Sequence, residues 1–141
     1  MAAVFVDANY LIAALLDRDR LHSEAVRLSA ELSEARFVTS TAVLVEVLNH
    51  LSKMGSYSRG RAVALYNGLH ADPSIEVVSF DDALIQRSVQ LYASRSDKRY
   101  SLTDCISMII CIERGIRDVL TQDHNFEQEG FTILMSSERR T

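Results

Sequence analysis

The strongest constraint on the fold is an alternation along the 141 residues. Apolar runs of strand length are separated by longer stretches in which apolar residues recur with helical period, a pattern typical of an α/β domain with a parallel sheet. The predicted strands are Ala3–Val6, Arg36–Ser40, Ile75–Phe80, Asp118–Thr121 and Thr132–Leu134. The predicted helices are Asn9–Leu16, Leu21–Ser33, Thr41–Met54, Ser58–Ala71, Asp81–Arg95 and Leu102–Arg114. We therefore expect a three-layer α/β/α arrangement around five mainly parallel strands.

The breaks between these elements are short. The only proline, Pro73, follows a predicted helix and precedes the third strand, where it stops the helix from continuing. Gly55 and Gly115 each follow a predicted helix and are expected to end it. No repeat, low-complexity segment or linker interrupts the chain, so residues 1–141 are predicted to form one domain.

Composition excludes several classes of protein. The two cysteines, Cys105 and Cys111, have neither a disulfide framework nor a zinc-ligand spacing, so we expect reduced thiols packed in a helix. The first residues do not resemble a signal peptide and no apolar stretch reaches membrane-spanning length, so we expect a cytoplasmic protein without a membrane partner. The net charge of −4 argues against a protein that grips nucleic acid by global positive charge. A polyanionic substrate must therefore be held locally.

Four acidic residues are placed where a parallel sheet binds its ligands, at the carboxyl ends of the strands. Asp7 directly follows the first predicted strand, and Asp123 lies just past the fourth. Glu46 falls in the second turn of the helix after the second strand, and Asp104 opens another helix. These four side chains are predicted to converge at one edge of the sheet.

Each acid also has a simpler interpretation. Asp7 and Asp123 have the position of helix N-caps, and Ser101 with Asp104 has the spacing of a capping box. Glu46 is harder to explain in this way, because it interrupts an apolar run at the margin of a helix's apolar face. Burial of an unpaired carboxylate costs several kcal/mol, so Glu46 needs a partner, and a single basic residue is the alternative to a shared site.

Four carboxylates brought together repel one another unless a cation compensates them or some of them stay protonated. Mg²⁺ or Mn²⁺ is the natural cation for a set of oxygen ligands, and the chain offers no Cys/His set for a softer metal. Such an ion activates water and offsets charge during phosphodiester cleavage. The acids therefore predict a metal-dependent hydrolase of phosphoryl compounds.

Four segments also carry a resemblance to a known family: VFVDANYLIAALL, STAVLVEVLNHL, YSLTDCISMIICIERG and VLTQDHNFEQEGFTIL. Together they resemble PIN domains, especially the VapC-type toxins of toxin–antitoxin pairs, over essentially the whole chain and in the right order. The resemblance implies that Asp7, Glu46 and Asp104 hold the metal and that Asp123 is the fourth member of the pocket. It further implies a polar neighbour in the pocket, supplied by Asn9 or Thr121.

The resemblance also implies an activity and partners. Similar proteins cut RNA endonucleolytically with Mg²⁺ or Mn²⁺, leave 5′-phosphate and 3′-hydroxyl ends, and are commonly homodimers. Many are silenced by an antitoxin that places a basic side chain in the acidic pocket. Asn125 stands where many relatives carry His, a departure that concerns substrate contacts.

We therefore expect an Mg²⁺/Mn²⁺-dependent endoribonuclease that cleaves single-stranded or structured RNA with metal-activated water, as the toxin of such a pair. Candidate contacts to RNA are Lys53, Arg59 and Arg61, just past the helix that carries Glu46. A solvated helix end is the simpler interpretation of each basic residue alone. For the homodimer, an exposed or half-exposed surface is expected at Tyr57, Tyr66 and Leu69, and the alternative is that these residues simply pack on the sheet.

Three alternatives remain open at this point. One is a PIN-like interaction module that binds a basic partner peptide without catalysis, and another is a housekeeping nuclease that processes RNA. The third is a different acid-cluster phosphohydrolase or phospho-acceptor domain, which fits less well because the first strand ends in VDAN, without a second Asp two residues on.

Overall fold

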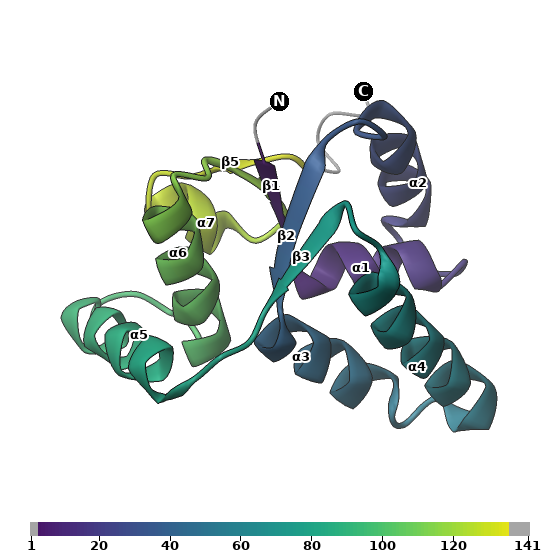
Figure 1. The fold of residues 1–141 in the computed structure, drawn as a ribbon, viewed down its shortest axis with the longest axis horizontal. Helices are drawn as coiled ribbons and strands as arrows, with labels where there is room; N and C mark the ends of the chain where they lie inside the picture. Colours follow the sequence, from purple (N-terminus) through teal and green to yellow (C-terminus); the bar gives the residue numbers. More distant parts are fainter. Residues whose placement is uncertain (1–2, 136–141) are drawn as a thin grey trace.

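A computed structural model describes residues 3–135 and contains a five-stranded sheet (Figure 1). The strands are β1 (Ala3–Val6), β2 (Arg36–Ser40), β3 (Ile75–Val78), β4 (Asp118–Leu120) and β5 (Thr132–Ile133). Their order in the sheet is β3-β2-β1-β4-β5, and every neighbouring pair is parallel. The chain therefore winds to one side of β1 through β2 and β3, and then to the other side through β4 and β5.

Helices cover both faces of this sheet. They are α1 (Ala8–Leu15), α2 (His22–Glu31), α3 (Thr41–Leu51), α4 (Gly55–Ala71), α5 (Asp82–Ser94), α6 (Leu102–Arg114) and α7 (His124–Gln128). Figure 1 shows α5, α6 and α7 on one side of the strands and α1, α2 and α4 on the other. The helix α3 lies at the lower end, where β2 runs into it. The predicted three-layer α/β architecture is confirmed.

The core lies between the sheet and the helices on each face. Central strands of a covered parallel sheet are buried on both sides, so they are apolar throughout. Phe5 in β1 and Val119 in β4 are fully buried in this way. From the helices, Val47 of α3 and Met108 of α6 meet them with fully buried side chains. Because the centre of the sheet is filled by apolar side chains, polar groups are confined to its edges.

Three local features differ from the sequence-based prediction. Several elements are shorter at their ends; β3, for example, stops at Val78. Gly55 does not end a helix as expected, because α3 already ends at Leu51 and Gly55 begins α4 with a φ of 88°. The sequence analysis also missed α7, which has only five residues and buries a single side chain, Phe126. Such a short helix has too few apolar positions to show a helical period.

Other expectations hold in the described part of the chain. Gly115 adopts a left-handed conformation with a φ of 66° and closes α6. Cys105 and Cys111 are buried and free. Among residues 3–135 no helix is long and apolar enough to cross a membrane.

Candidate functional site

The register of the sheet brings Asp7 beside Thr121. Val6 of β1 aligns with Leu120 of β4, so the next residue of each strand lies at the carboxyl edge, where the strand order changes direction. The main-chain N–H of Asp7 donates to the carbonyl of Leu120 over 3.2 Å. The hydroxyl of Thr121 donates to Asp7 Oδ2 over 2.8 Å. The Asp7 carboxylate is thus held by both strands.

Thr121 connects the segments after β1 and β4. Its single hydroxyl proton goes to Asp7, so the oxygen is left to accept hydrogen bonds. It accepts one from Asn9 Nδ2 at 2.8 Å and one from the main-chain N–H of Asp123 at 3.1 Å. Asn9 Oδ1 in turn accepts the N–H of Gln122 at 3.2 Å. Asn9 and Thr121 therefore both belong to the network around Asp7.

Asp104 and Asp123 cap helices, as their positions in the sequence also allowed. Asp104 forms a complete capping box with Ser101, with both hydrogen bonds at 3.0 Å. Asp123 Oδ1 accepts the main-chain N–H of Asn125 at 2.9 Å. Asp7 occupies the N-cap position of α1 but forms no capping hydrogen bond there. Capping therefore explains some of the hydrogen bonds of Asp104 and Asp123. It does not explain why Asp7 is buried at the end of β1.

Glu46 lies on the exposed side of α3. The helical period turns Val43 and Val47 into the core and leaves Glu46 facing outward, so the expectation of a buried carboxylate was wrong. Its pKa is nevertheless raised, first by partial loss of hydration and then by the negative charges of Asp104 and Asp123. Glu46 thus lies within electrostatic reach of the other acids without being buried among them.

The electrostatics of Asp7 show how the acids affect one another. Asp7 is only 6% exposed, and burial raises its pKa to about 7, with further contributions from the charges of Asp104 and Glu46. Burial likewise raises the pKa of Asp104, and the charge of Asp123 adds to the rise. Within residues 3–135, no Arg or Lys forms an ion pair with any of these four acids. Their negative charge is therefore not balanced by an Arg or Lys ion pair, and His50, one turn along α3, only partly offsets the rise in the pKa of Glu46.

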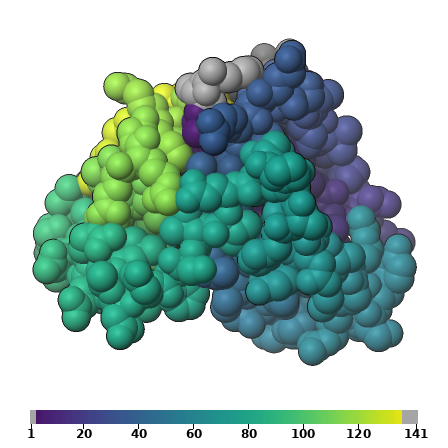
Figure 2. Space-filling model, viewed as in Figure 1, coloured from purple at the N-terminus to yellow at the C-terminus, as the bar shows by residue number. Residues whose placement is uncertain are grey.

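The acids lie at the end of the molecule that is hollowed. Figure 2 shows an indentation at the lower edge, between the part that carries α3 and α4 and the part that carries α5. The carboxyl ends of the strands point to the same end in Figure 1. Asp7 is buried, Asp104 and Asp123 are half-buried, and Glu46 is exposed. The exposure of the four carboxylates therefore increases from the edge of the sheet out to solvent.

The donor set fits a hard divalent cation in its chemistry. All four candidate ligands are carboxylates, which is the donor type that Mg²⁺ and Mn²⁺ prefer. In the described residues, no three His, Cys, Asp or Glu side chains already lie close enough together to hold one ion. Asn125 Nδ2 lies between two of the acids, donating to Asp104 Oδ2 at 3.2 Å and to Asp123 Oδ2 at 3.5 Å. Asp104 and Asp123 are thus bridged by an amide, whereas Asp7 and Glu46 lie within electrostatic reach of Asp104.

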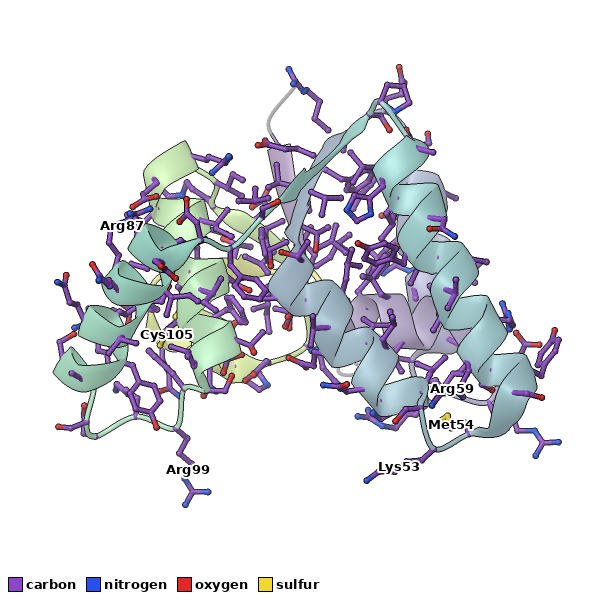
Figure 3. All side chains as sticks on the ribbon, turned by 60° about the horizontal axis from the view of Figure 1, so that its bottom comes forward. Lys53, Met54, Arg59, Arg87, Arg99 and Cys105 are labelled. Carbon is purple, nitrogen blue, oxygen red and sulfur yellow. The ribbon has the colours of Figure 1, made fainter. Side chains whose placement is uncertain are left out.

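The three basic residues predicted to contact RNA have different surroundings. Arg59 donates to the carbonyl of Ser52 at 3.0 Å, and the guanidinium of Arg61 lies 6.0 Å from the centre of the Tyr57 ring. Lys53 is exposed and forms no hydrogen bond or ion pair with the rest of residues 3–135. None of the three forms an ion pair with the acids. Figure 3 shows Lys53 and Arg59 together beside the turn between α3 and α4.

Two further basic residues beside segments that carry an acid were missed by the sequence analysis. Arg99, in the connection between α5 and α6, is exposed and forms no hydrogen bond or ion pair within the described residues; it lies opposite Lys53 in Figure 3. Arg20 donates to Gln122 Oε1 at 3.1 Å, directly between Thr121 and Asp123 along the chain. The run DKRY before the Asp104 helix is a signal that could have indicated Arg99, whereas nothing in the sequence links Arg20 to Gln122.

An apolar pocket lies elsewhere in the molecule. It has a volume of about 230 Å³ and is lined by side chains of α1, α4 and the first three strands, among them Tyr10, Leu65 and Leu69. Because its lining carries almost no polar group, it does not suit phosphate chemistry, and the acid cluster remains the candidate site.

The raised pKa of Asp7 predicts a pH dependence of stability in the absence of metal. The folded-state pKa of about 7 exceeds the ordinary value of 3.8, so the folded protein binds this proton more tightly between the two values. The free energy of unfolding therefore decreases as pH rises from about 4 to about 7. In EDTA at pH 8, Asp7→Asn should melt at or above the wild-type temperature, and at pH 4 the difference should vanish.

Asp72→Asn is a matched control with the opposite sign. Hydrogen bonds from Ser74 lower the pKa of Asp72, so its charged form stabilises the fold above the unfolded pKa and the substitution should lower the melting temperature at pH 8. Thermal melts by circular dichroism measure both variants. A loss of stability in Asp7→Asn at pH 8 would contradict the electrostatic description of the cluster.

Comparison with known proteins agrees with this geometry. The family model of the PIN domain matches residues 4–131. Among solved structures, VapC20 of Mycobacterium tuberculosis, described as a toxin that cleaves the sarcin-ricin loop, is 24% identical with a TM-score of 0.83, over 94% of this chain and 99% of that one. FitAcB of Neisseria gonorrhoeae is 15% identical with a TM-score of 0.67, over 94% of this chain and 96% of that one.

DNA-bound VapBC of Salmonella typhimurium is 20% identical with a TM-score of 0.64, over 95% of this chain and 98% of that one. No curated protein matches the sequence. These structural similarities are similarities of fold, whereas the family model spans nearly the whole chain. The chain therefore belongs to the PIN-domain family.

Proposed function

We propose that the protein is a divalent-metal-dependent endoribonuclease and the toxin of a toxin–antitoxin pair. The observation that carries this proposal is a set of four carboxylates, within electrostatic reach of one another at the carboxyl edge of a PIN-domain sheet, that form no ion pair with Arg or Lys in residues 3–135. Asp7, Glu46, Asp104 and Asp123 would hold the ion. The similarity in fold to VapC20, which is described as a toxin that cleaves the sarcin-ricin loop, supports RNA as the substrate.

The side chains have separate roles in this mechanism. A bound Mg²⁺ or Mn²⁺ would supply water activation and would offset the negative charge that develops on the phosphate. Asp7 is held rigidly by Thr121, so it provides a fixed ligand at the buried end of the site. Asp104 and Asp123 are oriented by the helices they cap. Glu46 is exposed and forms no ion pair within residues 3–135, so its carboxylate is accessible from the solvent side of the site.

RNA must approach four negative charges, so basic residues outside the cluster have to compensate its phosphates. Lys53 and Arg99 suit this role because both are exposed and lie apart from each other, beside α3 and in the connection that leads into α6, the helices that carry Glu46 and Asp104 (Figure 3). Arg59 and Arg61 would add to the side that carries Lys53, although each already contacts another group of the protein. The negative net charge of the chain makes this local compensation necessary.

The uncompensated acids also suit an antitoxin as partner. A basic side chain entering the cluster would neutralise it and block access for metal and RNA. The fold is shared with a toxin–antitoxin complex from Klebsiella pneumoniae, at 17% identity and a TM-score of 0.62. A PIN-like module that only binds a basic peptide would use the same charges, so cleavage is the property that separates the two functions.

The first prediction concerns cleavage itself. Purified protein incubated with total RNA and Mn²⁺ should produce fragments with 5′-phosphate ends, and EDTA should abolish them. Asp104→Asn keeps a capping side chain but removes one ligand charge, so the rate should decrease by about 100-fold or more. Asp81→Asn changes the cap of α5 outside the cluster and should leave the rate within about twofold. Full activity in EDTA, or cyclic-phosphate ends, would rule out the proposed mechanism.

The second prediction concerns substrate binding. Lys53→Ala and Arg99→Ala should each raise KM several-fold with little change in kcat, and each should reduce the slope of log affinity against log salt by about 1. Arg87→Ala is the control, because Arg87 is engaged by Glu113 at 2.6 Å on the α5–α6 surface. If all three variants showed the same salt dependence as wild type, RNA would have to be bound elsewhere.

The third prediction concerns assembly as a homodimer through α4. This helix has 17 residues but buries only Ala62, and it exposes Tyr57 by 77% and Tyr66 by 38%. An exposed aromatic surface of this kind is typical of protein interfaces. Light scattering at tens of micromolar should give twice the chain mass of 15.8 kDa. The double substitution of Tyr57 and Tyr66 by Ala should reduce this to one chain, whereas Tyr92→Ala on α5 should not; a wild-type monomer would contradict the dimer.

A further inference from the structure

The side chain of Asn125 bridges two of the acids. Its Nδ2 group donates to Asp104 Oδ2 at 3.2 Å and to Asp123 Oδ2 at 3.5 Å. The main-chain N–H of the same residue donates to Asp123 Oδ1 at 2.9 Å. Asp104 belongs to α6 and Asp123 precedes α7, so this amide links two separate elements of the site.

The bridge has an electrostatic consequence. The two N–H groups of a carboxamide carry partial positive charge, and each can satisfy one carboxylate. Within residues 3–135, neither Asp104 nor Asp123 has an ion pair with Arg or Lys, and Asn125 is the side-chain donor that they share. The amide therefore reduces the repulsion between two carboxylates whose other hydrogen bonds in the described chain come from main-chain N–H groups rather than from a charged side chain.

We infer that Asn125 is a positioning residue that holds Asp104 and Asp123 together in the metal-free protein and competes with a divalent cation for them. This inference rests on the proposed function. The carboxylate oxygens that accept from the amide are the same donors that the cation needs. N–H groups directed at a cation are repelled by it, so the amide has to turn away before the cation binds both acids. Asn125 thereby stabilises the empty site and weakens metal binding.

A purely structural role for Asn125 predicts something different. Its contribution to the start of α7 comes from the main-chain N–H, which Asn125→Ala retains. Alanine is also well tolerated in a helix. If the side chain served only the local fold, its removal would leave the affinity for metal unchanged.

The experiment compares wild type, Asn125→Ala and Asn67→Ala in the full chain. Asn67 is exposed in the middle of α4 and is a matched control for loss of an Asn side chain. Titration with Mn²⁺, followed by the electron paramagnetic resonance of the free ion, should show about fivefold tighter binding for Asn125→Ala. In EDTA this variant should melt about 3 °C below wild type. Asn67→Ala should match wild type in affinity.

A second measurement tests whether the effect passes through Asp104. In EDTA, Asn125→Ala should no longer lower the melting temperature when Asp104 is already Asn, because the repulsion that the amide offsets is gone. Equal or weaker Mn²⁺ binding by Asn125→Ala, or an unchanged destabilisation in the double variant, overturns the inference. Either result would leave the proposed function intact, provided that the wild type binds Mn²⁺ and cleaves RNA. If wild type bound no Mn²⁺, both would fall.

Discussion

The hydrogen bond between Thr121 and Asp7 is the interaction on which the rest of the site depends. It joins the ends of β1 and β4, the two strands at which the order of the sheet changes direction. The same hydroxyl accepts from Asn9 and from the main chain of Asp123, so the first and last parts of the site are fixed to one atom. A change in the register of β1 against β4 would separate all of these groups at once.

The acid cluster opposes folding, and the apolar core compensates for it. Burial and neighbouring charge raise the pKa of Asp7 to about 7, which means that the folded chain holds this carboxylate in an unfavourable place at neutral pH. A function that needs an ion is a physical reason for such a site, since a cation removes the repulsion. The core beside it, filled by side chains such as Phe5 and Val119, supplies the stability that the edge lacks.

Capping and metal binding are not exclusive roles for an acid. Asp104 completes a capping box with Ser101, and Asp123 caps α7, yet both carboxylates also lie within electrostatic reach of Glu46. Capping orients each carboxylate at the start of a helix, where the positive end of the helix dipole favours negative charge. The local interpretation of the sequence therefore describes how these side chains are positioned and leaves their function open.

Much of the fold was predictable because it depends on local periodicity: the five strands, six of the helices and the position of Asp7 and Asp123 after their strands follow from the spacing of apolar residues. Tertiary structure decided what depends on contacts between distant segments. The approach of Glu46 to Asp104 and Asp123, the bridge formed by Asn125 and the place of Arg99 relative to Lys53 each depend on how distant segments of the chain pack. The periodicity of apolar residues determines which face of a helix carries a given residue. Which other segment that face contacts is determined by the packing of the whole chain.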